Sequence, residues 1–346
     1  MSTDATVSAP LAKYHRRIAA VLETAGYLAT EPIAKSLQGE IWRAIHAESG
    51  KLCVIKVASK ALHKQKSVII NHQKYVVNEN IMKEMRILKY LSSFAECPPS
   101  IIRYRDSFHS KHEYYLEMQY GGASMFDFIV KAHKAMLADK LEVANWHKLI
   151  KLAFQQIIDG VAFMHSKHIS HFDLSLENMT IVKDLSISVT EHGNIEFTKI
   201  EQELQVKLID FGLAERLKSK HKDETGRFRS EKHCGKRNYQ CPEIAAGKAF
   251  DPMANDVWCC GVALFMMAAG GCPWSVAKPT DECFRLIMHG QIRSVLETWN
   301  RLSYFDQDLL DLLANIFQFQ EKRISVAQIQ RHAWLKPAEA SKHEDA

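Results

Sequence analysis

The sequence predicts an α+β protein of two lobes, with a small β-rich N-lobe that contains one key helix and a larger, mainly α-helical C-lobe. Residues 33–57 and 101–119 carry β-prone runs, and residues 78–91 between them have the period of a single helix. From Asn145 onward helical periodicity dominates. Because 346 residues exceed the usual size of one hydrophobic core, length alone favours about two lobes.

The composition is that of a soluble globular protein, with 47% hydrophobic and 25% charged residues. The eight cysteines form no C-x-x-C pair, so we expect reduced thiols and a cytoplasmic location, with the nucleus as the alternative. The first residues lack a charged-then-apolar leader. The longest apolar run, 257–269, is too short to span a bilayer and predicts a buried core helix.

The formal net charge of +5 is concentrated in one stretch. Residues 214–239 hold nine Lys or Arg and four Asp or Glu, and nine minus four gives an excess of five, equal to that of the whole chain. This indicates one basic loop rather than a general nucleic-acid surface. The loop would either favour acidic substrates or be solvated.

The N-terminal part is predicted to comprise an extension, residues 1–30, and the N-lobe, residues 31–119. Residues 11–24 have apolar positions spaced for one helical face, which predicts a helix packed on the body, with a regulatory role as the less favoured alternative. Residues 60–78 are interpreted as a long linker whose lysines form a solvated face.

The C-lobe is predicted over residues 120–337, followed by a tail at 338–346. Residues 146–165 have clear helical spacing, and residues 309–319 and 325–335 predict two closing helices. Residues 183–205 are interpreted as an extra hairpin of unknown purpose.

Three motifs carry the chemistry. His171–Asn178 reads His-Phe-Asp-Leu-Ser-Leu-Glu-Asn, which has the spacing of H-R-D-L-x-x-x-N. Val206–Gly212 predicts a short buried strand that ends on Asp210-Phe-Gly, and Val54-Ile-Lys56 precedes both. With three motifs in this order, the chain resembles a eukaryotic protein kinase of the Ser/Thr type over nearly its whole length. The ending His332-Ala-Trp-Leu looks most like the calmodulin-dependent branch.

The resemblance implies a bilobal protein-kinase-like fold and a role for each motif residue. Asp173 would orient and deprotonate the acceptor hydroxyl, and Asn178 and Asp210 would hold Mg²⁺. Lys56 would hold the α- and β-phosphates of ATP, braced by Glu84 on the helix at 78–91. Glu79 is the competing partner of that lysine.

The glycine-rich loop departs from the family pattern. Gly39 matches the third glycine of G-x-G-x-x-G, whereas Ala34 and Ser36 stand at the first two positions. Glycine lets backbone N–H groups approach phosphates closely, so these substitutions predict a stiffer loop and poorer nucleotide contact.

The resemblance also places an adenine site where the chain crosses to the second lobe. Met118 would guard the pocket, and Gln119 and Tyr120 would offer backbone groups to the base. Ser124 stands where many relatives have a ribose-binding acid, and Asp127 could take its place.

Phe172 stands where many relatives have an Arg that receives an activation-loop phosphate. The loss of that guanidinium removes a charge-assisted contact worth roughly 1–3 kcal/mol, so we expect activity without activation-loop phosphorylation.

Ser175 and Glu177 match neither the Ser/Thr nor the Tyr kinase signature. Lys236 replaces a Thr that in the family contacts the catalytic-loop lysine. The resemblance therefore implies that the hydroxyl and the ammonium are exchanged between positions 175 and 236. We expect Lys236 to supply the missing positive charge near the γ-phosphate, with a solvated lysine as the alternative.

Other matches are structural supports. Asp256 corresponds to the acid that bonds the catalytic-loop backbone, and Glu243 is expected to pair with Arg323.

The resemblance implies a protein serine/threonine kinase that uses ATP and Mg²⁺ and acts on a Ser or Thr hydroxyl of a protein, with no nucleic-acid or membrane partner. A pseudokinase that serves as a scaffold with weak nucleotide binding is the alternative. The substrate and the oligomeric state are not indicated by the sequence.

Overall fold

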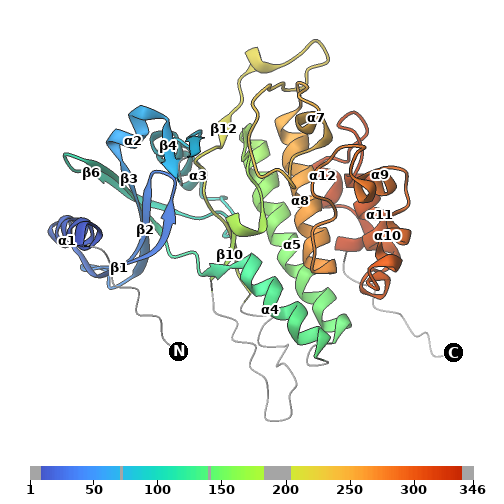
Figure 1. Ribbon diagram of the computed structural model, residues 1–346, viewed down its shortest axis with the longest axis horizontal. Helices are drawn as coiled ribbons and strands as arrows, with labels where there is room; N and C mark the ends of the chain where they lie inside the picture. The colour runs from blue at the N-terminus through green and yellow to red at the C-terminus, as the bar shows by residue number, and fades with distance from the viewer. Residues whose placement is uncertain (1–8, 71–72, 139–141, 183–203, 337–346) are drawn as a thin grey trace. The chain divides into compact units, whose positions relative to one another are not determined.

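The computed structural model describes residues 9–70, 73–138, 142–182 and 204–336, and the chain folds as two units (Figure 1). The first unit comprises the described residues within Met1–Ala95, Ile102–Gly121 and Phe211–Leu213. The second comprises those within Glu96–Ile101, Gly122–Asp210 and Ala214–Ala346. The chain is therefore α+β, with the sheet in one unit and most helices in the other.

The first unit is built on a five-stranded antiparallel sheet in the order β1-β2-β3-β7-β6. Its strands are β1 (Tyr27–Ser36), β2 (Gly39–His46), β3 (Leu52–Ser59), β6 (Tyr104–His109) and β7 (Glu113–Gln119). The helices are α1 (Ala9–Thr24), α2 (Lys60–Gln65) and α3 (Ile81–Ser92), and a separate hairpin joins β4 (Ser67–Ile70) to β5 (Gln73–Val76).

Helix α1 is part of the core of this unit. Its Ile18 and Leu22 are fully buried in one hydrophobic cluster with strand residues that include Trp42 and Ile55. Strand β1 begins at Tyr27, so the predicted boundary at residue 30 falls inside a strand of the sheet.

The linker interpretation of residues 60–78 was wrong in part, because α2 and the β4-β5 hairpin lie there. Ser59 caps α2 by accepting the N–H of Leu62. Lys66 ends the helix in the left-handed region at φ 52°. These short elements have no long apolar period, which is why the sequence did not predict them.

The second unit is mainly helical. Its helices are α4 (Met125–Leu137), α5 (Val143–Ser166), α7 (Pro242–Ala245), α8 (Pro252–Ala269), α9 (Glu282–Met288), α10 (Ile292–Thr298), α11 (Gln307–Ile316) and α12 (Val326–Ile329). Short strands complete it: β8 (Ala123–Ser124), β10 (Met179–Ile181) and β11 (Val206–Leu208) form one sheet, and β9 (Ile169–Ser170) pairs with β12 (Glu215–Arg216).

Helix α8 corresponds to the apolar run that predicted a core helix. Asp251 caps its start, Pro252 occupies the first turn, and Gly270 ends it at φ 76°. Among the described residues, α8 alone has the length and apolar composition of a membrane span, and 89% of that stretch is buried inside the protein.

The predicted closing helices are shorter than expected. The first is α11, whereas the second is reduced to α12 followed by a 3-10 turn at Ala333–Leu335. The hairpin predicted at 183–205 falls almost entirely outside the described residues.

Candidate active site

Lys56 and Glu84 form a buried ion pair in the first unit. Lys56 lies on β3 and Glu84 on α3, and Lys56 Nζ is 2.9 Å from Glu84 Oε2. Glu79 is the weaker partner, because its Oε2 is 3.8 Å from the same nitrogen. Both side chains of the main pair are nearly inaccessible to water, at 6% and 1% exposed. Losing one of them would leave an uncompensated buried charge.

The cap of helix α3 and its buried face fix the position of Glu84. Asn80 caps the helix by accepting the N–H of Lys83, and Glu84 lies on the helical face that also buries Ile81 and Leu88. The second carboxylate oxygen of Glu84 accepts the N–H of Phe211, the residue after Asp210, at 3.1 Å. One carboxylate thus holds both Lys56 and the backbone of Phe211.

Gly39 is required by strand packing. A Cβ at this position would lie 2.1 Å from the carbonyl oxygen of Val57 on the neighbouring strand. The preceding turn is anchored as well, because Gln38 Nε2 donates to the carbonyl oxygen of Glu79 at 2.6 Å. A phosphate-binding role for Gly39 remains a prediction.

The residues predicted to surround adenine and ribose are largely committed to structural contacts. Met118 is buried on β7, and Gln119 donates its backbone N–H to the carbonyl oxygen of Arg103 at 2.9 Å. Tyr120 is half-buried. Ser124 caps α4 by accepting the N–H of Asp127 at 3.4 Å. Their roles toward a nucleotide remain predictions.

The catalytic loop of the second unit is fixed by Asp256. Its carboxylate accepts the backbone N–H groups of His171 and Phe172 at 2.9 and 3.1 Å, as the sequence predicted. Phe172 is buried and lies in the left-handed region at φ 68°. Two hydrogen bonds to one buried carboxylate therefore hold a backbone conformation that is unfavourable for phenylalanine.

Asp173 and Asn178 are joined directly. Asn178 Nδ2 donates to the backbone oxygen of Asp173 at 2.7 Å and to its Oδ2 at 2.9 Å. Burial raises the pKa of Asp173, while the nearby charges of Lys236 and His171 act in the opposite direction. A raised pKa makes this carboxylate a better proton acceptor than an exposed aspartate.

Asp210 is placed next to this loop by backbone pairing. It follows β11 at φ 61°, and Ile209 before it donates its N–H to the carbonyl oxygen of Asn178 at 3.0 Å. Because the amide nitrogen of Asn178 is used by Asp173, its amide oxygen is the atom suited to a metal. The donor set of one carboxylate and one amide oxygen fits Mg²⁺, which takes few protein oxygens when phosphates supply others. The described residues contain no cluster of three or more His, Cys, Asp or Glu able to hold a metal by themselves.

Lys236 contacts the catalytic loop, as expected from the exchange of residue types. Its Nζ lies 2.6 Å from Ser175 Oγ and 3.2 Å from Glu177 Oε2. Its backbone N–H donates to Asp173 Oδ1 at 3.3 Å. The contact between positions 175 and 236 is therefore present, whereas a role at the γ-phosphate remains a prediction.

Lys232 was missed by sequence reasoning. Its Nζ is 2.7 Å from Glu215 Oε1 and 5.2 Å from the centre of the Phe172 ring. Glu215 lies on β12, which pairs with β9 just before the catalytic loop. A lysine among several in a basic loop carries no sequence signal of this contact.

The predicted pair of Glu243 and Arg323 is formed inside the second unit. Arg323 Nη2 lies 3.3 Å from Glu243 Oε2, and the side chains are 1% and 7% exposed. Arg323 also donates to the carbonyl oxygens of Gln318 and Ala254. This guanidinium therefore joins three segments of the unit.

The first unit holds Lys56 and Glu84, and the second holds Asp173, Asn178 and Asp210. These are the side-chain types that phosphoryl transfer requires. A family model described as protein kinase domain matches residues 29–335. The chain belongs to this protein kinase family.

The curated relatives include Ser/Thr kinases of plants and animals. "SNF1-related protein kinase catalytic subunit alpha KIN12" of Arabidopsis thaliana is 26% identical over 84% of this chain and 48% of its own length. "CBL-interacting protein kinase 21" of Oryza sativa subsp. japonica is 27% identical over 93% of this chain and 51% of its own. "SNF-related serine/threonine-protein kinase" of Homo sapiens is 27% identical over 87% and 32%. The chain thus spans about half or less of the length of these relatives.

Proposed function

We propose that this chain is an active protein kinase that transfers the γ-phosphoryl group of ATP to a Ser or Thr hydroxyl of a protein. The observation that supports the proposal most is the buried ion pair between Lys56 and Glu84, with Glu84 also bonded to the residue after Asp210. A chain without nucleotide chemistry has no physical need to bury this charge pair.

The proposed reaction forms a bond between the acceptor oxygen and the γ-phosphorus and breaks the bond from that phosphorus to ADP. Asp173 would accept the hydroxyl proton, and Asn178 holds its carboxylate in one orientation. Lys56 would stabilise the negative charge of the α- and β-phosphates. Lys236 would add positive charge close to Ser175 and Asp173.

Asn178 and Asp210 are the residues that would hold Mg²⁺. The ion would offset the negative charge of the phosphates of bound ATP. The backbone pairing between the two segments keeps their oxygens in a fixed relation.

The choice of Ser or Thr as the acceptor rests on the relatives, because the catalytic loop carries neither residue signature. We also propose a reducing location, the cytoplasm or nucleus, since none of the eight cysteines, all within the described residues, forms a disulfide.

A pseudokinase is the second candidate. It is favoured by the glycine loop, in which Ala34 and Ser36 replace glycines and Gln38 is bonded to the Glu79 carbonyl. A β1-β2 turn that is held by contacts within the protein would approach the phosphates less closely and bind them more weakly.

One assay separates the two candidates. The full chain is incubated with labelled ATP, Mg²⁺ and a mixed peptide library, beside the Asp173→Asn variant, and phosphorylated residues are identified. An active kinase gives label on Ser or Thr that falls about 10²- to 10⁴-fold in the variant, the usual contribution of a general base. Equal background labelling of both proteins would favour the pseudokinase.

A further inference from the structure

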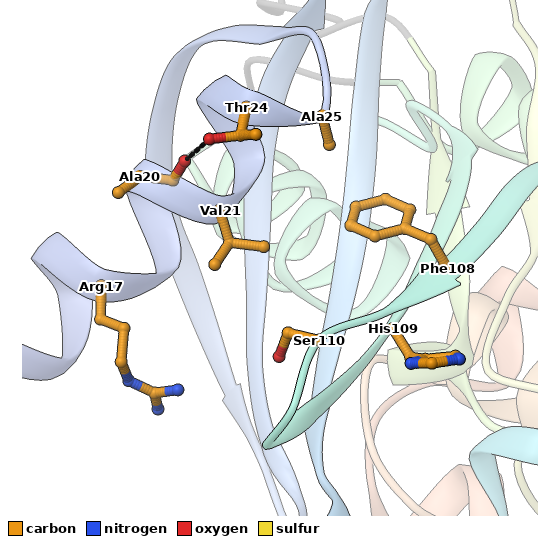
Figure 2. A pocket seen from close by; sticks show the side chains of 8 residues that line it. All are labelled: Arg17, Ala20, Val21, Thr24, Ala25, Phe108, His109 and Ser110. Atoms are coloured by element: carbon orange, nitrogen blue, oxygen red, sulfur yellow. Dashed lines mark hydrogen bonds between the residues drawn. The ribbon is translucent and has the colours of Figure 1, made fainter.

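The first unit has a groove that the proposed chemistry does not use. It lies between α1 and the end of β6 and has a volume of about 520 Å³. Figure 2 shows Val21 on the helix and Phe108 on the strand facing the same space, with Arg17 at one end. Ala20, Thr24 and Ser110 complete most of the lining. The groove is large enough for an apolar side chain of a partner.

The ring of Phe108 gives the groove a firm wall. It stacks on Tyr115 with ring centres 4.7 Å apart and on Tyr27 at 6.1 Å. On the other side, α1 is held by its buried Ile18 and Leu22. The two walls are therefore built by the core of the unit and do not depend on exposed loops.

A basic hollow of about 630 Å³ adjoins this groove. Arg17 lines both. The hollow is also lined by Lys60, Lys64, Lys111 and His112, with Glu113 as its acid. One arginine and three lysines line the hollow with a single glutamate, so the hollow has a net positive charge.

The basic groups differ in what they already contact. Both Nη atoms of Arg17 bond Glu113, at 2.8 and 2.6 Å. Lys60 Nζ donates to the Ser110 carbonyl at 2.6 Å. Lys64 and Lys111 are exposed, and neither forms a salt bridge within the part of the chain that the structure describes. The positive charge that Glu113 does not offset therefore comes mainly from separate lysines, Lys64 and Lys111 among them.

We propose that this composite surface docks an acidic segment of a partner protein, with one apolar side chain in the groove and carboxylates over the lysines. Separate lysine ammonium groups suit a run of carboxylates better than a single phosphate. Bidentate recognition of a phosphate needs two N–H groups of one arginine, and Glu113 already occupies those of Arg17. The concave apolar groove distinguishes the site from a flat anionic surface.

Fluorescence anisotropy of a labelled peptide tests the proposal. The probe is Gly-Glu-Glu-Leu-Glu-Glu-Asp-Gly, which has no hydroxyl residue and cannot be a kinase substrate. We expect the Lys64→Glu/Lys111→Glu variant to bind at least about tenfold more weakly than wild type at low salt. The matched Lys51→Glu/Lys148→Glu variant changes net charge equally at exposed positions that line neither the groove nor the hollow, and it is expected to bind like wild type.

The apolar half of the site is tested with a second peptide in which Gly replaces Leu. This peptide should bind wild type several-fold more weakly, and the Val21→Ala variant should weaken binding of the Leu peptide only. The Asp173→Asn variant should bind the Leu peptide like wild type, so docking can fail or succeed independently of the proposed catalysis.

Three outcomes would overturn the inference. The first is equal weakening by the two double variants, which would indicate general electrostatic attraction. The second is equal affinity for the Leu and Gly peptides. The third is tighter binding, dependent on Lys64 and Lys111, to phosphatidylserine vesicles or oligo-dT than to the peptide.

Discussion

Lys236 contacts Ser175 of the catalytic loop, the pairing that the sequence predicts. The ammonium at 236 meets the hydroxyl of Ser175, and Glu177 lies beside it. Glu177 offsets part of its charge, so the ammonium is held in place by one hydroxyl and one carboxylate. Its backbone N–H to Asp173 positions the loop whatever the side chain does.

Removing this ammonium should reduce turnover. We expect Lys236→Ala to lower kcat by about 10²-fold, the effect typical of losing one group that stabilises charge in the transition state. Lys236→Arg should recover part of the loss. Arg237→Ala, at an exposed neighbouring position, should stay within about twofold. Steady-state kinetics would contradict the assignment if the two alanine variants were equally impaired.

Asp173 should make the reaction sensitive to acid. Burial raises its pKa, and the base works only when deprotonated, so kcat/KM should fall as pH drops through this raised pKa. The charge of Lys236 lowers the same pKa, so Lys236→Ala should move the acid limb to higher pH. A pH profile with an unmoved acid limb would show that the ammonium does not act on this carboxylate.

At the scale of elements, the catalytic loop is tied to β12 and to the basic loop within the second unit. Phe172 packs on Phe250, and Lys232 lies over its ring while bonding Glu215. These contacts fix Phe172 and Glu215 through the side chains of Phe250 and Lys232 alone.

Activity should therefore survive phosphatase treatment with less than about a twofold change, because no guanidinium at 172 can be switched by a phosphate. Lys232→Met should instead lower activity, since it leaves Glu215 without this cation, whereas Lys248→Met at an exposed site should not. Peptide phosphorylation before and after phosphatase treatment gives the test. A large loss on dephosphorylation would contradict it.

The helices that sequence reasoning found are those with long apolar periods. Helix α5 extends over Val143–Ser166, close to the predicted 146–165, and α3 over Ile81–Ser92. Helix α2 and the β4-β5 hairpin were missed because four- to six-residue elements depend on caps and turns. The phosphate contact of Gly39 stays a prediction, whereas the clash that a Cβ there would make with the Val57 carbonyl oxygen is revealed only by the strand register.

At the scale of the whole molecule, the motifs predicted the family and the two-unit architecture, while the contacts that hold the motifs came from the fold. Glu84 could be named as the partner of Lys56, but its second bond to Phe211 could not. The helix predicted at 11–24 to pack on the body is confirmed as α1, although an apolar stripe alone does not say which surface it covers. Its burial against the sheet makes it part of the first unit.

The ion pair of Arg323 and Glu243 should dominate the stability of the second unit. Burial tends to raise the pKa of Glu243, but Arg323 and the Gln320 N–H outweigh it and lower the pKa overall. Arg323→Met should reduce the free energy of unfolding by about 3–5 kcal/mol. Arg285→Met, which breaks an exposed pair with Glu282, should change it by about 0–1 kcal/mol.

Urea unfolding followed by tryptophan fluorescence would report this difference, since Arg323 lies 4.8 Å from the Trp258 ring. A group with a depressed pKa contributes stability above its unfolded pKa and loses it as pH falls through the folded value. The gap between wild type and Arg323→Met should therefore shrink in acid. Equal effects of the two arginine variants at neutral pH would contradict the account.

The proposed kinase activity requires that Lys56, paired with Glu84, holds the phosphates of ATP and that Asp210, beside Asn178, holds Mg²⁺. Calorimetric titration of ATP into wild type, Lys56→Met and Asp210→Asn, each with Mg²⁺ and with EDTA, tests it most directly. The account predicts that Lys56→Met weakens ATP binding under both conditions, whereas Asp210→Asn weakens it only when Mg²⁺ is present. Equal ATP affinity for all three proteins, or no measurable binding to wild type, would contradict it.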